Sequence, residues 1–207
     1  MNKKSIQEAL QKFTESPGYL LKTGWLKSMA DKQAVDSQGK PIPWLTYPAI
    51  DFLEGRVRPQ MRVFEYGSGN STFWWSARVA ELISCEHDKQ WFAHFQPQIP
   101  ANTTYLLRRA KGGSTAYSDE IGNYSDRIDI LIIDGRDRVN CAKNGLVSLR
   151  SGGVIVWDNS DRHEYQEGYD FLRANDFKRL DFWGMGALAT RRWCTSVFYR
   201  QFNCLNI

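Results

Sequence analysis

Four acidic residues, Glu65, Glu86, Asp134 and Asp158, each stand at the end of an apolar run. Carboxylates accept hydrogen bonds from ligand hydroxyl and amino groups, and they accept protons when their pKa is suitably placed. When such runs form parallel strands of one sheet, their carboxyl ends meet at one edge, and ligands bind in the crevice outside that edge. The repeated pairing of apolar run and carboxylate therefore predicts a polar ligand site there.

A Gly-x-Gly turn follows the first of these runs, in the segment Glu65-Tyr66-Gly67-Ser68-Gly69-Asn70-Ser71. Glycines let the backbone approach a ligand closely. Glu86 comes roughly 20 residues later, the separation expected between a glycine-rich turn and the carboxylate that binds a ribose. The third glycine of the dinucleotide fingerprint is missing, because Asn70 and Ser71 stand there. A cofactor without a pyrophosphate therefore fits this turn better.

Polar residues also follow the later runs. Asp134 ends the run 130–133, and Asp158 opens the polar segment 158–165, which contains His163. Histidine is the natural base near neutral pH, so His163 would deprotonate an acceptor hydroxyl. Two plainer interpretations stay open: Asp134 caps the next helix, and His163 belongs to a solvated loop.

From residue 62 onward, strand and helix periods alternate. The predicted strands cover residues 62–66, 81–86, 103–109, 128–133, 154–157, 177–183 and 195–200, and the helices cover 71–79, 88–95, 138–149 and 167–174. The run 128–133, apolar except for Asp129, is typical of a strand buried on both faces. These elements predict an α/β fold with a Rossmann-like, seven-stranded, doubly wound sheet that is mostly parallel and has an antiparallel edge.

The first 58 residues follow a different pattern. Helices are predicted over residues 5–13, 19–32 and 49–55, and prolines favour an extended segment at 41–48. A chain of 207 residues suits one α/β domain with a small extension. We therefore expect residues 1–58 to form a helical N-terminal extension or cap and residues 59–207 to form the ligand-binding domain.

The composition argues against several classes of protein. The net charge of +4, from 27 basic and 23 acidic residues, is too mild to indicate nucleic acid binding. The four cysteines lie far apart, so neither a zinc site nor a disulfide framework is indicated. No run approaches the ~18 apolar residues of a membrane span, and the first residues do not resemble a signal peptide. We expect a cytoplasmic protein whose oligomeric state stays open, a homodimer included.

The pattern Glu-x-Gly-x-Gly-x-Ser resembles motif I of the class I S-adenosylmethionine-dependent methyltransferases. Segments 43–48, 64–72, 134–136 and 198–205 are similar to bacterial methyltransferase-like proteins near the FkbM-type enzymes, and segments 130–136 and 151–159 to small-molecule O-methyltransferases. The resemblance implies S-adenosylmethionine as cofactor and S-adenosylhomocysteine as product. It implies cofactor contacts from Glu65, Gly67, Ser68, Gly69, Ser71, Glu86, His87 and Asp134.

One branch of these relatives, the catechol and caffeoyl-CoA type, binds a divalent cation through residues that match Asp134, Asp158 and Asn159 here. Three oxygen ligands would suit Mg²⁺. In the alternative, Asp158 is a general base or only positions the substrate. We do not favour a metal, because a bound cation would be opposed by the charge of the flanking arginines, Arg136, Arg138 and Arg162.

The resulting expectation is a methyltransferase (EC 2.1.1.-) that methylates a hydroxyl of a small or glycan-like acceptor by in-line transfer, with Asp134, Asp158 and His163 as catalytic residues. No acidic residue follows the third strand, so Ser114, Tyr117 or backbone atoms are expected to bind the adenine, beside His87. The alternative is a non-catalytic or nucleotide- or NAD-binding Rossmann-like protein. Nucleic acid and membrane partners are not expected.

Overall fold

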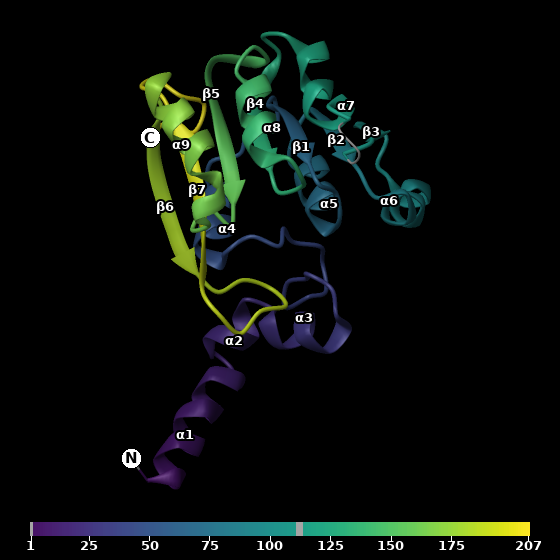
Figure 1. The fold of residues 1–207 in the computed structure, drawn as a ribbon. Coiled ribbons are helices and arrows are strands. Elements are labelled where there is room, and N and C mark those ends of the chain that lie inside the picture. Colours follow the sequence, from purple (N-terminus) through teal and green to yellow (C-terminus); the bar gives the residue numbers. More distant parts are fainter. Residues whose placement is uncertain (1, 111–113) are drawn as a thin grey trace.

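The strands form one twisted sheet in which the carboxyl ends of the first five strands face a common edge. A computed structural model describes residues 2–110 and 114–207. The strands are β1 Arg62–Tyr66, β2 Glu81–Glu86, β3 Thr103–Leu107, β4 Ile128–Ile133, β5 Leu149–Asp158, β6 Lys178–Gly184 and β7 Trp193–Tyr199. Their order is β3-β2-β1-β4-β5-β7-β6 (Figure 1). Strands β1 to β5 pair in parallel and β7 is antiparallel to β5 and β6, so the predicted mostly parallel sheet with an antiparallel edge is confirmed.

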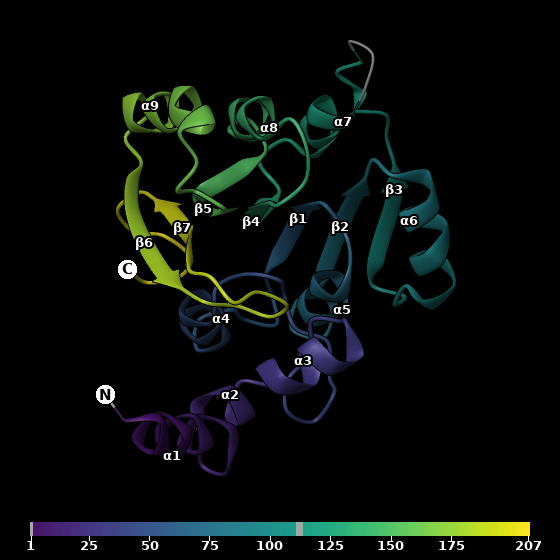
Figure 2. The ribbon, with the colours of Figure 1, turned by 60° about the horizontal axis from the view of Figure 1, so that its bottom comes forward.

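Helices cover both faces of this sheet (Figure 2). Helices α4 Tyr47–Glu54 and α5 Asn70–Ser76 lie on one face, and α7 Ala116–Asp119, α8 Arg138–Gly145 and α9 Gln166–Ala174 lie on the other. Helix α6 Lys89–Phe95 connects β2 to β3.

Alternation of side chains along β4 explains the two layers. Ile130 and Ile132 join the core beneath α4 and α5, whereas Leu131 and Ile133 join the core beneath α7, α8 and α9. Successive residues of a strand point to opposite faces, so a strand covered on both faces must be apolar throughout. The predicted doubly wound arrangement is therefore confirmed.

The N-terminal part contains α1 Lys3–Thr14, α2 Tyr19–Lys22 and α3 Trp25–Asp31. Helix α1 projects from the body of the molecule and buries none of its residues (Figure 1). The single helix predicted over residues 19–32 is wrong, because the chain breaks at Gly24. This glycine has φ +78°, and a Cβ there would lie 2.3 Å from the Asp36 backbone. Only glycine allows that conformation and that close approach.

The segment before the first strand is tied closely to the sheet. Ala34, Ile42 and Leu53 belong to the same core as the strands. The Asn70 side chain donates a hydrogen bond to the Ala34 carbonyl at 2.7 Å. Residues 34–57 therefore share a core with the strands, and the division of the chain at residue 58 stays a prediction.

One predicted strand boundary shifts because of local packing. Strand β5 begins at Leu149, so residues 149–153, which precede the predicted strand 154–157, lie inside it. Gly152 has φ +82°, and a Cβ there would lie 2.7 Å from the Phe202 carbonyl oxygen, a restriction that the sequence does not reveal. The loop predicted at 111–114 lies outside the described residues except for Ser114. Among the described helices, none is long and apolar enough to cross a membrane.

A matched pair of substitutions tests the burial of strand β5 in the core. Val156 of β5 is fully buried, whereas Val147 is 58% exposed. We expect Val156→Ala to lower the free energy of unfolding by about 2–3 kcal/mol, because it removes buried methyl groups and leaves a cavity. Val147→Ala should change it by less than about 0.5 kcal/mol. Urea unfolding measures both, and equal effects would contradict the burial described above.

Candidate active site

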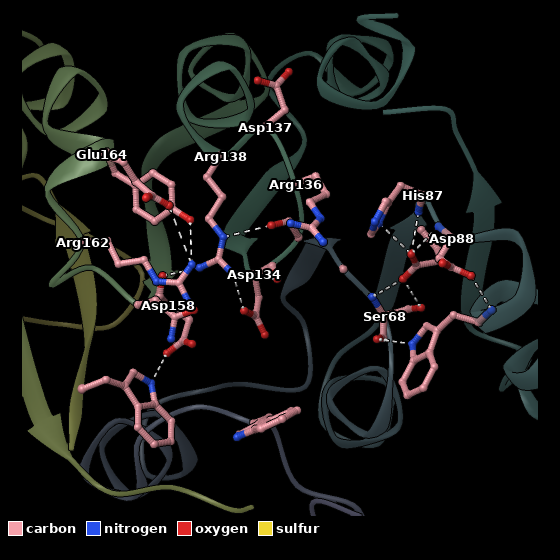
Figure 3. A pocket seen from close by; sticks show the side chains of 18 of the residues that line it. Ser68, His87, Asp88, Asp134, Arg136, Asp137, Arg138, Asp158, Arg162 and Glu164 are labelled. Carbon is pink, nitrogen blue, oxygen red and sulfur yellow. Dashed lines mark hydrogen bonds and ion pairs between the residues drawn. The ribbon is translucent and has the colours of Figure 1, made fainter. Parts of the chain in front are cut away.

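A cleft of about 1420 Å³ lies beyond the carboxyl ends of β1, β2, β4 and β5 (Figure 3). Pockets for one drug-sized ligand are typically ~300–1,000 Å³, so this cleft has room for more than one small molecule. Its lining contains residues that follow each of these strands, among them Gly67, Ser68, Glu86, His87, Asp134, Asp158 and Asn159. The cleft is therefore at the edge of the sheet that the carboxylates predicted.

The turn after β1 packs directly on the turn after β4. Gly67 has φ +90°, and a Cβ at this position would lie 2.9 Å from the Gly135 nitrogen. The Gly67 N–H also donates to the Cys85 carbonyl at 3.0 Å. The backbone can follow this path only because residue 67 has no side chain. The glycine brings three strand ends together and leaves bare backbone at the cleft surface.

Glu65 lies beneath this turn. Its side chain is fully buried and accepts hydrogen bonds from three hydroxyls, those of Ser71 at 2.5 Å, Thr72 at 2.6 Å and Ser84 at 2.6 Å. Burial raises its pKa to about 7. Neither Glu65 nor Ser71 lines the cleft. The hydrogen bonds of Glu65 with Ser71, Thr72 and Ser84 fasten the start of α5 to β1 and β2.

Glu86 stands at the end of β2 and lines the cleft although its carboxylate is almost fully buried. One carboxylate oxygen accepts from the Ser68 backbone N–H at 3.0 Å and from the Ser68 hydroxyl at 2.8 Å. The other accepts from the backbone N–H groups of His87 and Asp88, both at 2.7 Å. These four donors fix the carboxylate beside the glycine turn (Figure 3).

Arg138, the first residue of α8, joins the ends of β4 and β5. Its guanidinium is buried and pairs with the Asp134 carboxylate at 3.0 Å. It also donates to the backbone carbonyls of Asp134 and Gly135, both at 3.0 Å, and to the carbonyl of Asp158. A single buried cation thus sets the separation of the two acidic residues (Figure 3).

Asp158 is held from the opposite side by the antiparallel edge of the sheet. Its Oδ1 accepts from the Trp193 indole N–H at 2.9 Å and from the Thr195 hydroxyl at 2.5 Å. Burial, and after it the charge of Asp134, raises the pKa of Asp158 to about 7. Burial likewise raises the pKa of Asp134 to about 6, although Arg138 lowers it. Each of the two carboxyls can therefore accept or release a proton near neutral pH.

The structure brings most of the predicted site residues together. Gly67, Ser68, Glu86, His87, Asp134 and Asp158 all line the cleft. Glu65, Gly69 and Ser71 lie in the same turn but do not line it, and their cofactor contacts stay predictions. His163 is exposed on the short 3₁₀ turn His163–Tyr165 and does not line the cleft, whereas its neighbours Arg162 and Glu164 do.

Sequence reasoning missed several contributors from distant segments. Trp193 and Thr195 reach Asp158 only because β7 inserts beside β5. Trp44, which is half exposed, enters the lining from the N-terminal segment. Ser114 and Tyr117, expected near an adenine, do not line the cleft, and Tyr117 is buried against His87. Arg136 and Arg138 were recognised only as charges that flank the acids.

The acidic residues fit a divalent cation poorly. Asp134 has one oxygen paired with Arg138, and Asp158 has one oxygen bound by two donors. A cation between these carboxylates would lie close to a buried guanidinium, whose charge repels it. Among the described residues, no group of three or more His, Cys, Asp or Glu side chains is arranged to hold a metal ion. These carboxylates are therefore better suited to accept hydrogen bonds and protons than to hold a divalent cation.

Comparison with known proteins supports the fold. No protein-family model matches the chain, and a search of curated proteins gives no match. The precorrin-6Y C5,15-methyltransferase of Geobacter metallireducens superposes with a TM-score of 0.59 at 14% identity, over 84% of this chain and 96% of that one. A methyltransferase of Geobacter sulfurreducens superposes with a TM-score of 0.56 at 14% identity, over 96% and 98% of the two chains.

The spermidine synthase of Thermotoga maritima is also similar, with a TM-score of 0.57 at 12% identity over 72% of this chain, which spans only 56% of that enzyme. An rRNA methylase of Streptococcus thermophilus has the same fold, with a TM-score of 0.55 at 14% identity over 77% of this chain and all of that one. At such identities the likeness establishes the fold. It is the fold of the class I S-adenosylmethionine-dependent methyltransferases.

The buried Glu65 carboxyl predicts a pH-dependent stability. Its pKa in the folded protein is about 7, above the ordinary value of 4.5, so the folded state binds this proton more tightly than the unfolded chain. The stabilisation is complete below about pH 4.5 and is lost as the pH rises to about 7. The free energy of unfolding of the wild type should therefore fall by up to about 3 kcal/mol over this pH range. In Glu65→Gln this fall should be absent.

Urea unfolding of wild type and Glu65→Gln between pH 4 and 8 measures this difference. Glu8→Gln, in exposed helix α1, is the matched control and should follow the wild-type curve. If the Glu65→Gln and wild-type curves ran parallel, the carboxyl would not be desolvated as described.

Proposed function

We propose that the protein is an S-adenosylmethionine-dependent methyltransferase that methylates a hydroxyl of a small or glycan-like acceptor. The observation that carries the proposal is the placement of Glu86. Its fixed carboxylate lies at the cleft surface beside the bare Gly67 backbone, and the Asp134 and Asp158 pair lies along the same cleft. The fold of the similar methyltransferases agrees with this arrangement.

The residues present suit such a cofactor. A ribose diol needs acceptors, and Glu86 is a cleft carboxylate whose two oxygens already accept from four donors within the chain. The Ser68 hydroxyl donates to Glu86 at 2.8 Å and also lies 2.7 Å from the Tyr105 hydroxyl. This hydroxyl has one proton, so when it turns to Tyr105 it leaves a position on Glu86 for a ribose hydroxyl. A Cβ at residue 67 would lie 2.9 Å from the Gly135 nitrogen and would displace the turn that carries Asp134.

Bound S-adenosylmethionine would supply an electrophilic methyl group on a sulfonium. The chain itself would hold the reactants and accept a proton. Asp134, ion-paired with Arg138, would face the cofactor's positive charge. Asp158, with a pKa of about 7, would accept the proton of the acceptor hydroxyl near neutral pH. Asp158 is the better candidate for the base, because His163 is exposed outside the cleft lining.

The fold alone does not select the acceptor, because the similar structures include an rRNA methylase. We favour a small acceptor because the positive charge of the chain is mild and scattered. A non-catalytic or NAD-binding protein is the alternative. The acidic pair with raised pKa values beside the cleft favours catalysis.

Replacement of Glu86 tests the cofactor site. Glu86→Ala removes charge-assisted hydrogen bonds worth roughly 1.5–3 kcal/mol, so S-adenosylhomocysteine should bind about 10- to 100-fold more weakly. Isothermal titration calorimetry measures the affinity, and circular dichroism checks that the variant is folded. Glu167→Ala, at an exposed position of α9, should bind like wild type. Unchanged affinity in a folded Glu86→Ala protein would sink the assignment.

The glycine turn allows an independent test with a matched pair. Gly67→Ala places a methyl group 2.9 Å from the Gly135 nitrogen at a φ of +90°, whereas a Cβ at Gly122 meets no atom within 4 Å. We expect Gly67→Ala to abolish measurable binding of S-adenosylhomocysteine and Gly122→Ala to leave it intact. Normal binding by a folded Gly67→Ala protein would place the cofactor elsewhere.

A further inference from the structure

Three arginines stand at the end of the cleft that holds Asp158. Arg162 follows β5, and Arg191 and Arg192 lie in the segment between β6 and β7. All three are exposed and line the cleft. A guanidinium offers five N–H donors in a planar fork that matches carboxylate and phosphate groups. These residues are therefore suited to bind an anion.

Their donors are little used within the protein. Across residues 2–110 and 114–207, Arg191 makes no hydrogen bond or ion pair, and Arg192 only lies over the Trp183 ring at 5.2 Å. Arg162 contacts the Tyr165 hydroxyl at 3.3 Å and Glu164 at 3.8 Å. Arg138, by contrast, donates hydrogen bonds to four acceptors within the protein.

The neighbouring carboxylates are mostly engaged with other partners. Asp158 accepts from Trp193 and Thr195, and Asp161 accepts from the Cys194 backbone N–H at 3.1 Å. Asp134 is paired with Arg138. Among the described residues, Glu164 is the acidic residue that forms an ion pair with one of the three arginines. The three guanidiniums therefore keep most of their N–H donors available for a ligand.

The segment that carries Arg191 and Arg192 is fixed to the rest of the fold. The Trp25 indole donates to the Ala189 carbonyl at 2.8 Å, and the Tyr47 N–H donates to the Met185 carbonyl at 2.8 Å. In Figures 1 and 2 this connection runs from the β6–β7 edge towards α3. The half-exposed Trp44 ring also lines the cleft and offers an apolar surface.

We propose that the methyl acceptor carries an anionic group, a carboxylate or a phosphate, which Arg162, Arg191 and Arg192 bind while the acceptor hydroxyl faces Asp158. The Trp44 ring packs against its apolar part. This inference rests on the proposed methyltransferase function and names the substrate class of the same cleft. It commits to a small anionic molecule rather than to the phosphate backbone of a nucleic acid.

Binding of simple anions tests the proposal without a known substrate. The probes are phenyl phosphate and benzoate, with phenol as the neutral analogue and a short single-stranded RNA as the macromolecular anion. Each is titrated into the protein with and without saturating S-adenosylhomocysteine, and nuclear magnetic resonance or calorimetry gives the affinity. Comparison of phenyl phosphate with benzoate distinguishes the two anionic groups.

Two double variants with the same change of charge provide the comparison. Arg191→Gln with Arg192→Gln should weaken the preferred anion at least tenfold and leave phenol unchanged. Arg162→Gln alone should also weaken binding of the preferred anion. Arg173→Gln with Lys178→Gln, exposed and outside the cleft lining, should bind the anion like wild type.

Each other outcome has a defined meaning. Failure of both anions to bind, or equal weakening in the two double variants, overturns the anionic-acceptor proposal. So does RNA binding that is tighter than that of both probes and is lost in the Arg191 and Arg192 variant. If the wild type bound the anions but did not bind S-adenosylhomocysteine, the methyltransferase proposal would be overturned. The assignment of the anion site would stand.

Discussion

The architecture of the cleft depends on one partly buried ion pair, that of the buried Arg138 with the half-buried Asp134. Taking a guanidinium and a carboxylate out of water is costly, and the cost is offset only when the remaining donors are also satisfied. Arg138 meets that condition with backbone carbonyls at the ends of both β4 and β5. The pair therefore fixes two strand ends relative to each other and keeps Asp134 beside Asp158. Removal of the Asp134 carboxylate would leave the buried Arg138 guanidinium without its ion-pair partner.

In the other half of the cleft, two carboxylates hold the backbone in place through hydrogen bonds. Glu65 binds three hydroxyls beneath the glycine turn, and Glu86 binds the turn and the start of α6 from the side. One carboxylate is thereby enclosed and the other is presented at the surface. The close contact of Gly67 with the β4–α8 turn joins this half to the half organised by Arg138. A ligand would meet a rigid surface at both ends.

Much of this fold could be predicted from local sequence, because apolar periods and strand-end carboxylates are local signals. The mostly parallel sheet and the edge at which the cleft lies follow from them. What could not be predicted depends on contacts between distant segments. Residue 138 meets residue 158, and Trp193 meets Asp158, only after the sheet has formed. The break at Gly24 likewise reflects the backbone of Asp36. His163 is exposed outside the cleft lining although its neighbours Arg162 and Glu164 line the cleft, a difference that depends on the path of the backbone in segment 158–165.

The central claim is that this cleft binds S-adenosylmethionine rather than a dinucleotide. Calorimetric titration of the unmodified protein with S-adenosylhomocysteine, and in parallel with NAD, tests it most directly. The account predicts saturable binding of one S-adenosylhomocysteine per chain and no measurable heat with NAD. Binding of NAD without binding of S-adenosylhomocysteine would contradict it.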